Sequence, residues 1–125
     1  MERGRPDEGL GRHQRLTQPR LFEETYAQRN KHVGRFMVLW LRSGEGAALR
    51  LGVVTSRKVG HAVIRTRARR RIREVYRRNR HQFSGAYDVV IVARASLNGA
   101  AWGDVTKDFL DLATRAGLMK RGNHE

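Results

Sequence analysis

The chain has 125 residues, of which 26 are lysine or arginine and 12 are aspartate or glutamate, so its net charge is +14. A chain of this length forms one domain with a modest core, and the charge indicates a polyanionic partner. There is no cysteine, which excludes disulfides and thiolate sites and fits a reducing, cytoplasmic setting. No apolar run approaches the ~18 residues of a membrane-spanning helix.

The two ends of the chain differ in composition from the middle. Residues 1–14 are rich in glycine, arginine and acids, with little apolar periodicity, which predicts a flexible arm and no secretory signal. Residues 121–125 are predicted to be a frayed tail. Residues 15–120 are therefore predicted to form a single domain.

The first ordered element is a short helix that follows the arm. Thr17 is a candidate N-cap, and Pro19 is tolerated in a first helical turn. The spacing places four side chains on one helical face: Leu21, Phe22, Thr25 and Tyr26.

Three apolar runs predict strands. Residues 36–42 carry large side chains on both faces, which is typical of a strand that is covered on both sides. Residues 49–56 are predicted to return antiparallel to that strand as a hairpin, because the glycine-containing connection at 43–46 is short. Residues 87–93 are rich in β-branched side chains and predict a central strand.

A helix over residues 62–80 is predicted between the second and third strands. One stripe of this helix suits a core: Ile64, Ala68, Ile72, Val75, Tyr76 and Asn79. The opposite face carries arginines: Arg69, Arg70, Arg73, Arg77 and Arg80. The order strand, helix, strand makes a β-α-β crossover, for which a right hand is the default.

The segment from Ser56 to Arg80 holds eleven basic residues and one acid, Glu74. A run of one sign destabilises an isolated helix, because like charges at positions i and i+4 repel each other. A polyanion would neutralise it, and the fork of an arginine matches phosphate oxygens two at a time. We therefore expect this face to bind nucleic acid.

The remaining sequence offers little for catalysis. Residues 105–116 repeat apolar side chains at helical spacing, with Gly117 as the C′ residue. Asp104, Asp108 and Asp111 flank that stripe, and their acids are better explained by the helix dipole than by a metal. The five histidines are scattered, and no nucleophile or phosphate-loop motif is present. We predict no catalytic residue and no metal site in the polypeptide.

Residues 56–74 read SRKVGHAVIRTRARRRIRE. This run resembles the signature of the protein subunit of bacterial ribonuclease P, S-K-K-x-G-x-A-V-x-R-N-R-x-K-R-x-x-R-E. The resemblance covers about residues 15–120 and includes these further positions: Arg15-Leu16, Phe22, Tyr26, Val38-Leu39-Trp40 and Tyr87-Asp88. Thr66 stands where the family usually has asparagine, which puts in doubt the hydrogen bond of that amide, and Arg69 stands where lysine is common.

The resemblance implies an α/β sandwich with a small mixed sheet and a left-handed crossover. It also implies a function as the subunit that assists a catalytic RNA in removing the 5′ leader of precursor tRNA, an endoribonuclease reaction that uses Mg²⁺ held mainly by RNA and substrate. One protein per catalytic RNA is expected. Eight positions match the RNA-binding motif: Arg57, Lys58, Arg65, Thr66, Arg67, Arg69, Arg70 and Arg73. Three aromatic residues are expected to line the cleft for the single-stranded leader: Phe22, Tyr26 and Trp40.

Three other readings of the sequence stay open. A basic ribosomal or RNA-chaperone protein would share the charge and the small domain. A DNA-binding protein would place the helix in a major groove, although a face that reads bases usually mixes amides and hydroxyls with arginine. A nuclease made of protein alone would cleave precursor tRNA without an RNA subunit.

For two of the expected cleft residues, Phe22 and Trp40, packing in the core is the competing explanation.

Overall fold

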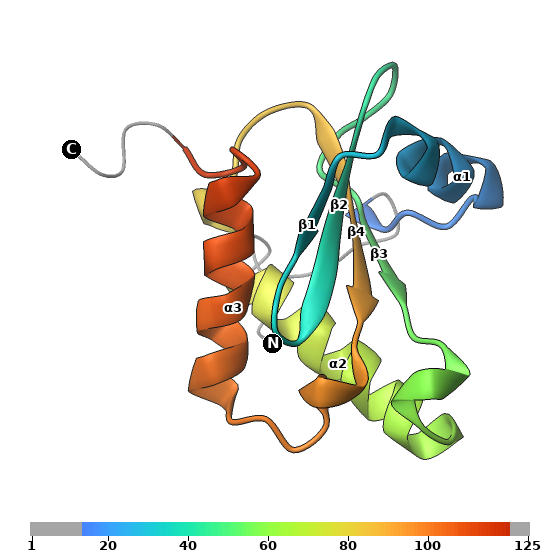
Figure 1. The fold of residues 1–125 in the computed structure, drawn as a ribbon. Helices are drawn as coiled ribbons and strands as arrows, with labels where there is room; N and C mark the ends of the chain where they lie inside the picture. Colours follow the sequence, from blue (N-terminus) through green and yellow to red (C-terminus); the bar gives the residue numbers. More distant parts are fainter. Residues whose placement is uncertain (1–13, 121–125) are drawn as a thin grey trace, which may run out of the picture.

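The computed structural model describes residues 14–120, so residues 1–13 of the predicted arm (1–14) and the predicted tail over residues 121–125 lie outside it. Its elements in chain order are α1 (Pro19–Gln28), β1 (Lys31–Val33), β2 (Met37–Ser43), β3 (Leu51–Val54), η3 (Arg57–Val59), α2 (Ala62–Asn79), η4 (Arg80–Gln82), β4 (Tyr87–Ala93), η5 (Ala95–Leu97) and α3 (Trp102–Arg115). Figure 1 shows α3 and α1 on opposite sides of the sheet. The predicted fold class, a small mixed sheet with helices packed on it, is confirmed.

The strand order is β1-β2-β4-β3, so the predicted hairpin between the strands near 36–42 and 49–56 is wrong. β4 lies between β2 and β3, antiparallel to β2 and parallel to β3. The direction predicted for β3 relative to β2 is right, but the two are not neighbours. β4 takes that place, and five of its seven residues are buried, as expected for the central strand that the sequence predicts. β1, which pairs with β2, is too short to be predicted from a sequence pattern.

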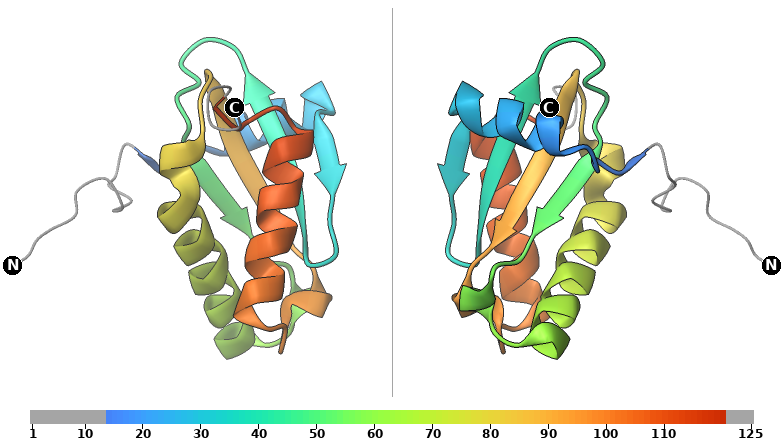
Figure 2. Two further views of the ribbon diagram at one scale, coloured as in Figure 1. Left: turned by 90° about the vertical axis from the view of Figure 1, so that its left-hand side faces the viewer. Right: turned by 90° about the vertical axis from the view of Figure 1, so that its right-hand side faces the viewer.

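The connection from β3 through α2 to β4 is left-handed. In the left view of Figure 2, α2 and α3 lie in front of the sheet, both parallel strands point down, and β4 lies to the right of β3. The default right hand is therefore wrong for this chain, and the left hand that the family resemblance implies is confirmed. In consequence α2 lies along the β3 edge of the sheet (Figure 2).

The main core lies between the sheet and the pair α2 and α3. The helix α2 contributes four buried side chains to it: Ala68, Ile72, Val75 and Tyr76. Ile64 and Asn79, which were predicted on the same stripe, are only half buried. From α3 the core receives Val105, Phe109, Leu112 and Ala113. Burying a side chain of the size of valine or larger contributes about 1.5–3 kcal/mol. These contacts place one face of α2 against the core.

A smaller cluster lies on the other face of the sheet, under α1. Leu16, Leu21 and Val90 are its buried members. The helix α1 begins at Pro19, and its N-cap is Gln18, whose side chain makes no capping bond, so the prediction of Thr17 as the cap is wrong. Of the predicted helical face, Leu21 and Thr25 are buried, whereas Tyr26 is exposed.

A buried carboxylate joins β2, β3 and β4. Asp88 is fully buried and accepts hydrogen bonds from Arg42 Nη1 at 2.9 Å and from Arg50 Nη2 at 2.8 Å. Burial alone would raise the pKa of Asp88, but the bonds from Arg50 and from the amides of Ala48 and Arg50 hold it below its ordinary value. Arg42 is also bonded to Glu24 of α1 at 2.9 Å. This network ties α1 to the sheet.

Candidate nucleic-acid interface

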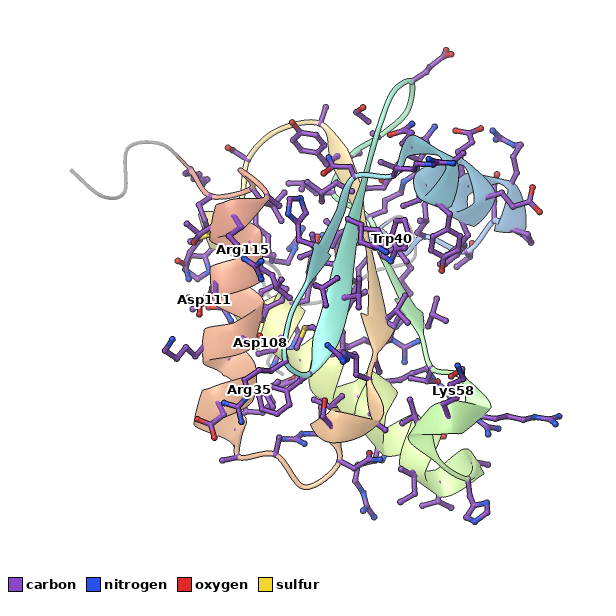
Figure 3. All side chains as sticks on the ribbon, viewed as in Figure 1. Arg35, Trp40, Lys58, Asp108, Asp111 and Arg115 are labelled. Atoms are coloured by element: carbon purple, nitrogen blue, oxygen red, sulfur yellow. The ribbon has the colours of Figure 1, made fainter. Side chains whose placement is uncertain are left out.

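The loop between β3 and α2 presents two cations at the start of the arginine helix. Ser56 begins the turn η3, and its hydroxyl accepts a hydrogen bond from the amide of Lys58. Gly60 ends the turn at φ 148°, and a Cβ there would lie 2.9 Å from the side chain of Ile64. A glycine is therefore needed at this position. The turn leaves the side chains of Arg57 and Lys58 exposed, and Figure 3 shows Lys58 beside this loop.

Two of the predicted RNA-binding residues, Arg65 and Arg69, hold this loop against α2. Arg65 Nη1 donates to the carbonyl of Gly60 at 3.1 Å. Arg69 donates to the hydroxyl of Thr55 at 2.7 Å and to that of Thr66 at 3.2 Å. The Thr66 hydroxyl thus acts as an acceptor for a neighbouring cation. Arg65 and Arg69 therefore serve partly as structural ties, although neither pairs with an acid among residues 14–120.

The other five predicted RNA-binding residues are Arg57, Lys58, Arg67, Arg70 and Arg73, and all five are exposed. Their side chains make no hydrogen bond or ion pair with any residue in the range 14–120. Burial of Arg73, together with the charges of Arg15 and Arg69, lowers the pKa of its guanidinium. These unneutralised cations follow η3 and the exposed side of α2, where a phosphate backbone would neutralise them.

The rest of the arginine run has other partners. Arg71 donates to the carbonyls of Leu97 at 2.7 Å and of Ala100, so it ties α2 to the segment before α3. Arg77 and Arg78 both pair with Glu74. The predicted arginine face is therefore strongest before Glu74, and this single acid of the run partly offsets the positive charge at the far end of α2.

A second candidate surface lies where α1 leaves part of the sheet uncovered. Four side chains of this region are half buried: Phe22, Trp40, Val54 and Val92. Tyr26 is 37% exposed, and its ring meets that of Trp40 edge to face, with centroids 4.8 Å apart. Figure 3 shows Trp40 on the side of the sheet that faces α1. The three predicted cleft residues are thus brought together on one face.

Phe22 reaches the edge strand β3 because position 52 has no side chain. A Cβ on Gly52 would lie 2.5 Å from Cζ of Phe22. The ring forms one wall of a cavity of about 160 Å³, whose other lining residues include Arg15, Thr17 and Arg73. This cavity connects the two candidate surfaces, because Arg73 belongs to α2 and Phe22 belongs to α1.

The acids of α3 lie away from both surfaces. Asp108 accepts hydrogen bonds from the amides of Arg35 at 3.0 Å and of Phe36 at 2.9 Å, so it holds the turn between β1 and β2. These two hydrogen bonds explain the presence of an aspartate at position 108 better than the helix dipole does. Asp111 pairs with Lys107. Figure 3 shows both aspartates on α3, across the sheet from Trp40. Within residues 14–120 no group of three or more histidines and acids is placed to hold a metal ion.

Two cations near the aromatic cleft were absent from the predicted site. Lys31 of β1 lies with its Nζ 5.3 Å from the ring centroid of Trp40. Arg15 lies next to β3, with which it forms an isolated parallel bridge at Leu51. Neither belongs to a charge run, so only the strand pairing reveals their positions.

Among the described helices, none is long and apolar enough to cross a membrane.

A one-sided row of arginines without acidic partners among residues 14–120, beside an open aromatic face, is typical of an RNA-binding α/β protein that contacts phosphates more than base edges. Comparisons with known proteins identify the family within this class. The family model described as Ribonuclease P matches residues 10–117. The chain belongs to this family.

Several relatives share this similarity over most of their length. The ribonuclease P protein component of Syntrophomonas wolfei is 29% identical over 112 residues, which cover 90% of this chain and 94% of the relative. That of Clostridium botulinum is 35% identical over 98 residues, which cover 78% of this chain and 88% of the relative. A basic ribosomal or chaperone protein is therefore not favoured.

Solved structures agree on the fold. The RNase P protein of Thermotoga maritima superposes with a TM-score of 0.72 at 28% identity and covers 81% of this chain and 96% of its own. The Staphylococcus aureus RNase P protein gives a TM-score of 0.73 at 23% identity, with 86% of this chain and 98% of its own covered. A ribonuclease P component has an RNA subunit as its partner, and the holoenzyme matures the 5′ ends of tRNAs.

Proposed function

We propose that this chain binds the catalytic RNA of ribonuclease P through η3 and the first turns of α2, and the single-stranded leader of precursor tRNA through the cleft beside α1. The observation that carries the first part is the set of five exposed cations without a partner in residues 14–120. Arg65 and Arg69 tie the loop to the helix, so the backbone that carries these cations is already arranged before RNA binds. Such preorganisation lowers the entropy cost of binding.

The leader cleft is supported by the aromatic rings on the uncovered part of the sheet. Stacking on aromatic side chains is worth about 1–3 kcal/mol per base and tolerates any base, which suits a leader whose sequence differs among tRNAs. Trp40 and Phe22 are half buried, so each ring packs in the small cluster and still keeps an exposed part. Core packing and leader binding are therefore compatible roles.

The chemistry is proposed to lie with the RNA. Mg²⁺ ions held mainly by RNA and substrate would activate the hydrolytic water, and the protein would position the leader and reduce phosphate repulsion. We propose one protein per catalytic RNA, as the family resemblance implies. The cysteine-free composition keeps a cytoplasmic location as a prediction.

Replacing Tyr26 by alanine tests the cleft. We expect precursor tRNA to bind the assembled holoenzyme about 1–3 kcal/mol more weakly, because one stacking ring is lost, with mature tRNA binding unchanged. Tyr26 is the suitable probe, since it is more exposed than Phe22 or Trp40. The measurement is the ratio of precursor to mature tRNA affinity at fixed salt and Mg²⁺.

Trp102→Ala provides the matched control, because Trp102 is a similarly exposed ring, 40% accessible, at the start of α3. It should leave the affinity ratio unchanged. If a folded Tyr26→Ala holoenzyme also keeps the ratio of the unmodified protein, Tyr26 does not sense the leader and the cleft assignment fails at its most exposed member.

A further inference from the structure

Lys31 places an unpaired cation beside the aromatic rings, at the β1 edge of the sheet. Lys31 and Trp40 are directly opposite each other in the antiparallel pair β1 and β2, so their side chains share one face of the sheet. The ammonium lies 5.3 Å from the centroid of the Trp40 ring. Lys31 is exposed and forms no ion pair with any acid in the described part of the chain.

The opposite edge of the same face also carries cations. Arg15 and Arg73 line the small cavity at β3 that Phe22 closes. Both side chains are exposed. Neither forms an ion pair with an acid among residues 14–120, and the pKa of Arg73 is lowered by burial and by the charges of Arg15 and Arg69. An anion placed in this cavity would relieve the repulsion between these cations.

The two groups of cations are too far apart for one phosphate. The sheet order places two strands, β2 and β4, between β1 and β3. At a strand spacing of about 4.8 Å, the outer strands are about 14 Å apart. Phe22, Tyr26 and Trp40 lie between the two edges. The pattern of cation, rings and cation matches the alternation of phosphates and bases in an extended single strand.

We propose that Lys31 is a second phosphate clamp for the leader, so that the single strand crosses the sheet between the β3 edge, where Arg15 holds it, and the β1 edge. The clamp rests on the proposed function of the cleft, and it extends the leader site to a strand that carries no residue of the arginine motif. Trp40 orients the ammonium of Lys31, and a base stacked on the exposed part of that ring brings its phosphate to Nζ.

The test uses the assembled holoenzyme and precursor tRNAs whose leaders are shortened one nucleotide at a time. Lys31→Gln should weaken binding of long-leader substrates about twofold to fivefold, the range of an exposed ion pair. It should lower the salt slope by about 0.7, the value for one phosphate contact of a single strand. Below a threshold leader length the effect should vanish. Arg15→Gln should have a different threshold, because the two residues are at opposite edges.

Two further variants complete the design. Lys31→Arg keeps the cation over the ring and should restore the affinity for long leaders. Lys107→Gln removes one exposed lysine from α3, across the sheet, and should change nothing at any leader length.

The outcomes separate the clamp from the cleft. If Tyr26→Ala and Arg15→Gln reduce leader affinity but Lys31→Gln does not at any length, the cleft stands and the clamp is wrong. An equal loss for mature tRNA, or equal thresholds for the Lys31 and Arg15 variants, also overturns the clamp. If none of the three variants changes the ratio of precursor to mature tRNA affinity, the leader does not occupy this face and both proposals fail.

Discussion

A triple variant with Arg67, Arg70 and Arg73 replaced by glutamine is expected to fold normally and to bind the catalytic RNA much more weakly. Glutamine has a helix propensity close to that of arginine. None of the three guanidiniums has a bonding partner in residues 14–120, so the folded state loses no hydrogen bond. Three lost phosphate contacts should make the salt dependence of binding shallower by about 2–3, at ~0.7–0.9 per contact.

The matched control removes three cations from the α3 side of the molecule, Arg35, Lys107 and Lys120, by the same change to glutamine. The two triple variants have equal net charge, so the comparison separates a local interface from a general electrostatic attraction. Binding to the catalytic RNA is measured as a function of salt for both. Equal salt slopes for the two variants would show that the α2 face is only solvated.

Asp88→Asn is expected to cause a large loss of fold stability. The change leaves Arg42, whose side chain is 5% exposed, facing Arg50 without the carboxylate that both bind. Removing one partner of a buried ion pair typically costs about 3–5 kcal/mol. Asp111→Asn is the control, because its pair with Lys107 is exposed and worth no more than about 1 kcal/mol. Denaturant unfolding measures both, and equal losses would contradict the role given to Asp88.

The same carboxylate predicts how stability depends on pH. The pKa of Asp88 is lowered in the folded state, so its contribution is complete above the unfolded pKa of about 3.9 and is lost as the pH falls through the folded value. Glu24 and Glu74 also have lowered pKa values and act in the same direction. Asp88→Asn should therefore lose less stability than the unmodified protein between about pH 5 and pH 2.

The helix α2 shows how much of the fold the sequence could predict. Its limits, its buried stripe and its cationic side all follow from helical spacing, and the structure agrees except near the ends, where Ile64 and Asn79 are half buried. The central position of β4 follows from its run of apolar, mostly β-branched side chains after Asp88. These features depend on local periodicity, which a single sequence displays directly.

Strand neighbours and crossover hand depend on contacts between distant residues. A short connection from β2 to β3 favours a hairpin, but β4 separates the two strands and Asp88 binds Arg42 and Arg50, one near each of them. No local pattern reveals that a later carboxylate will satisfy two earlier arginines. The left hand of the crossover could be expected only from the family resemblance.

The candidate site could be predicted only in part, because some of its contacts also join residues that are distant in the sequence. The motif supplied all eight proposed RNA-binding positions, but it could not show that Arg65 and Arg69 also bond to Gly60 and Thr55. Helical spacing also could not show that Arg71 ties α2 to the segment before α3, because its acceptors, the carbonyls of Leu97 and Ala100, lie far along the chain. Lys31 joins the proposed site only because strand pairing sets it opposite Trp40.

The most direct measurement is cleavage of precursor tRNA by a bacterial ribonuclease P RNA with and without this protein at low Mg²⁺. At low Mg²⁺ phosphate repulsion is poorly screened, so the RNA alone should cleave slowly. The protein should restore cleavage at the 5′ end of the mature tRNA, and it should produce none without the RNA. A folded protein that gives no stimulation, or that cleaves precursor tRNA by itself, would contradict the account.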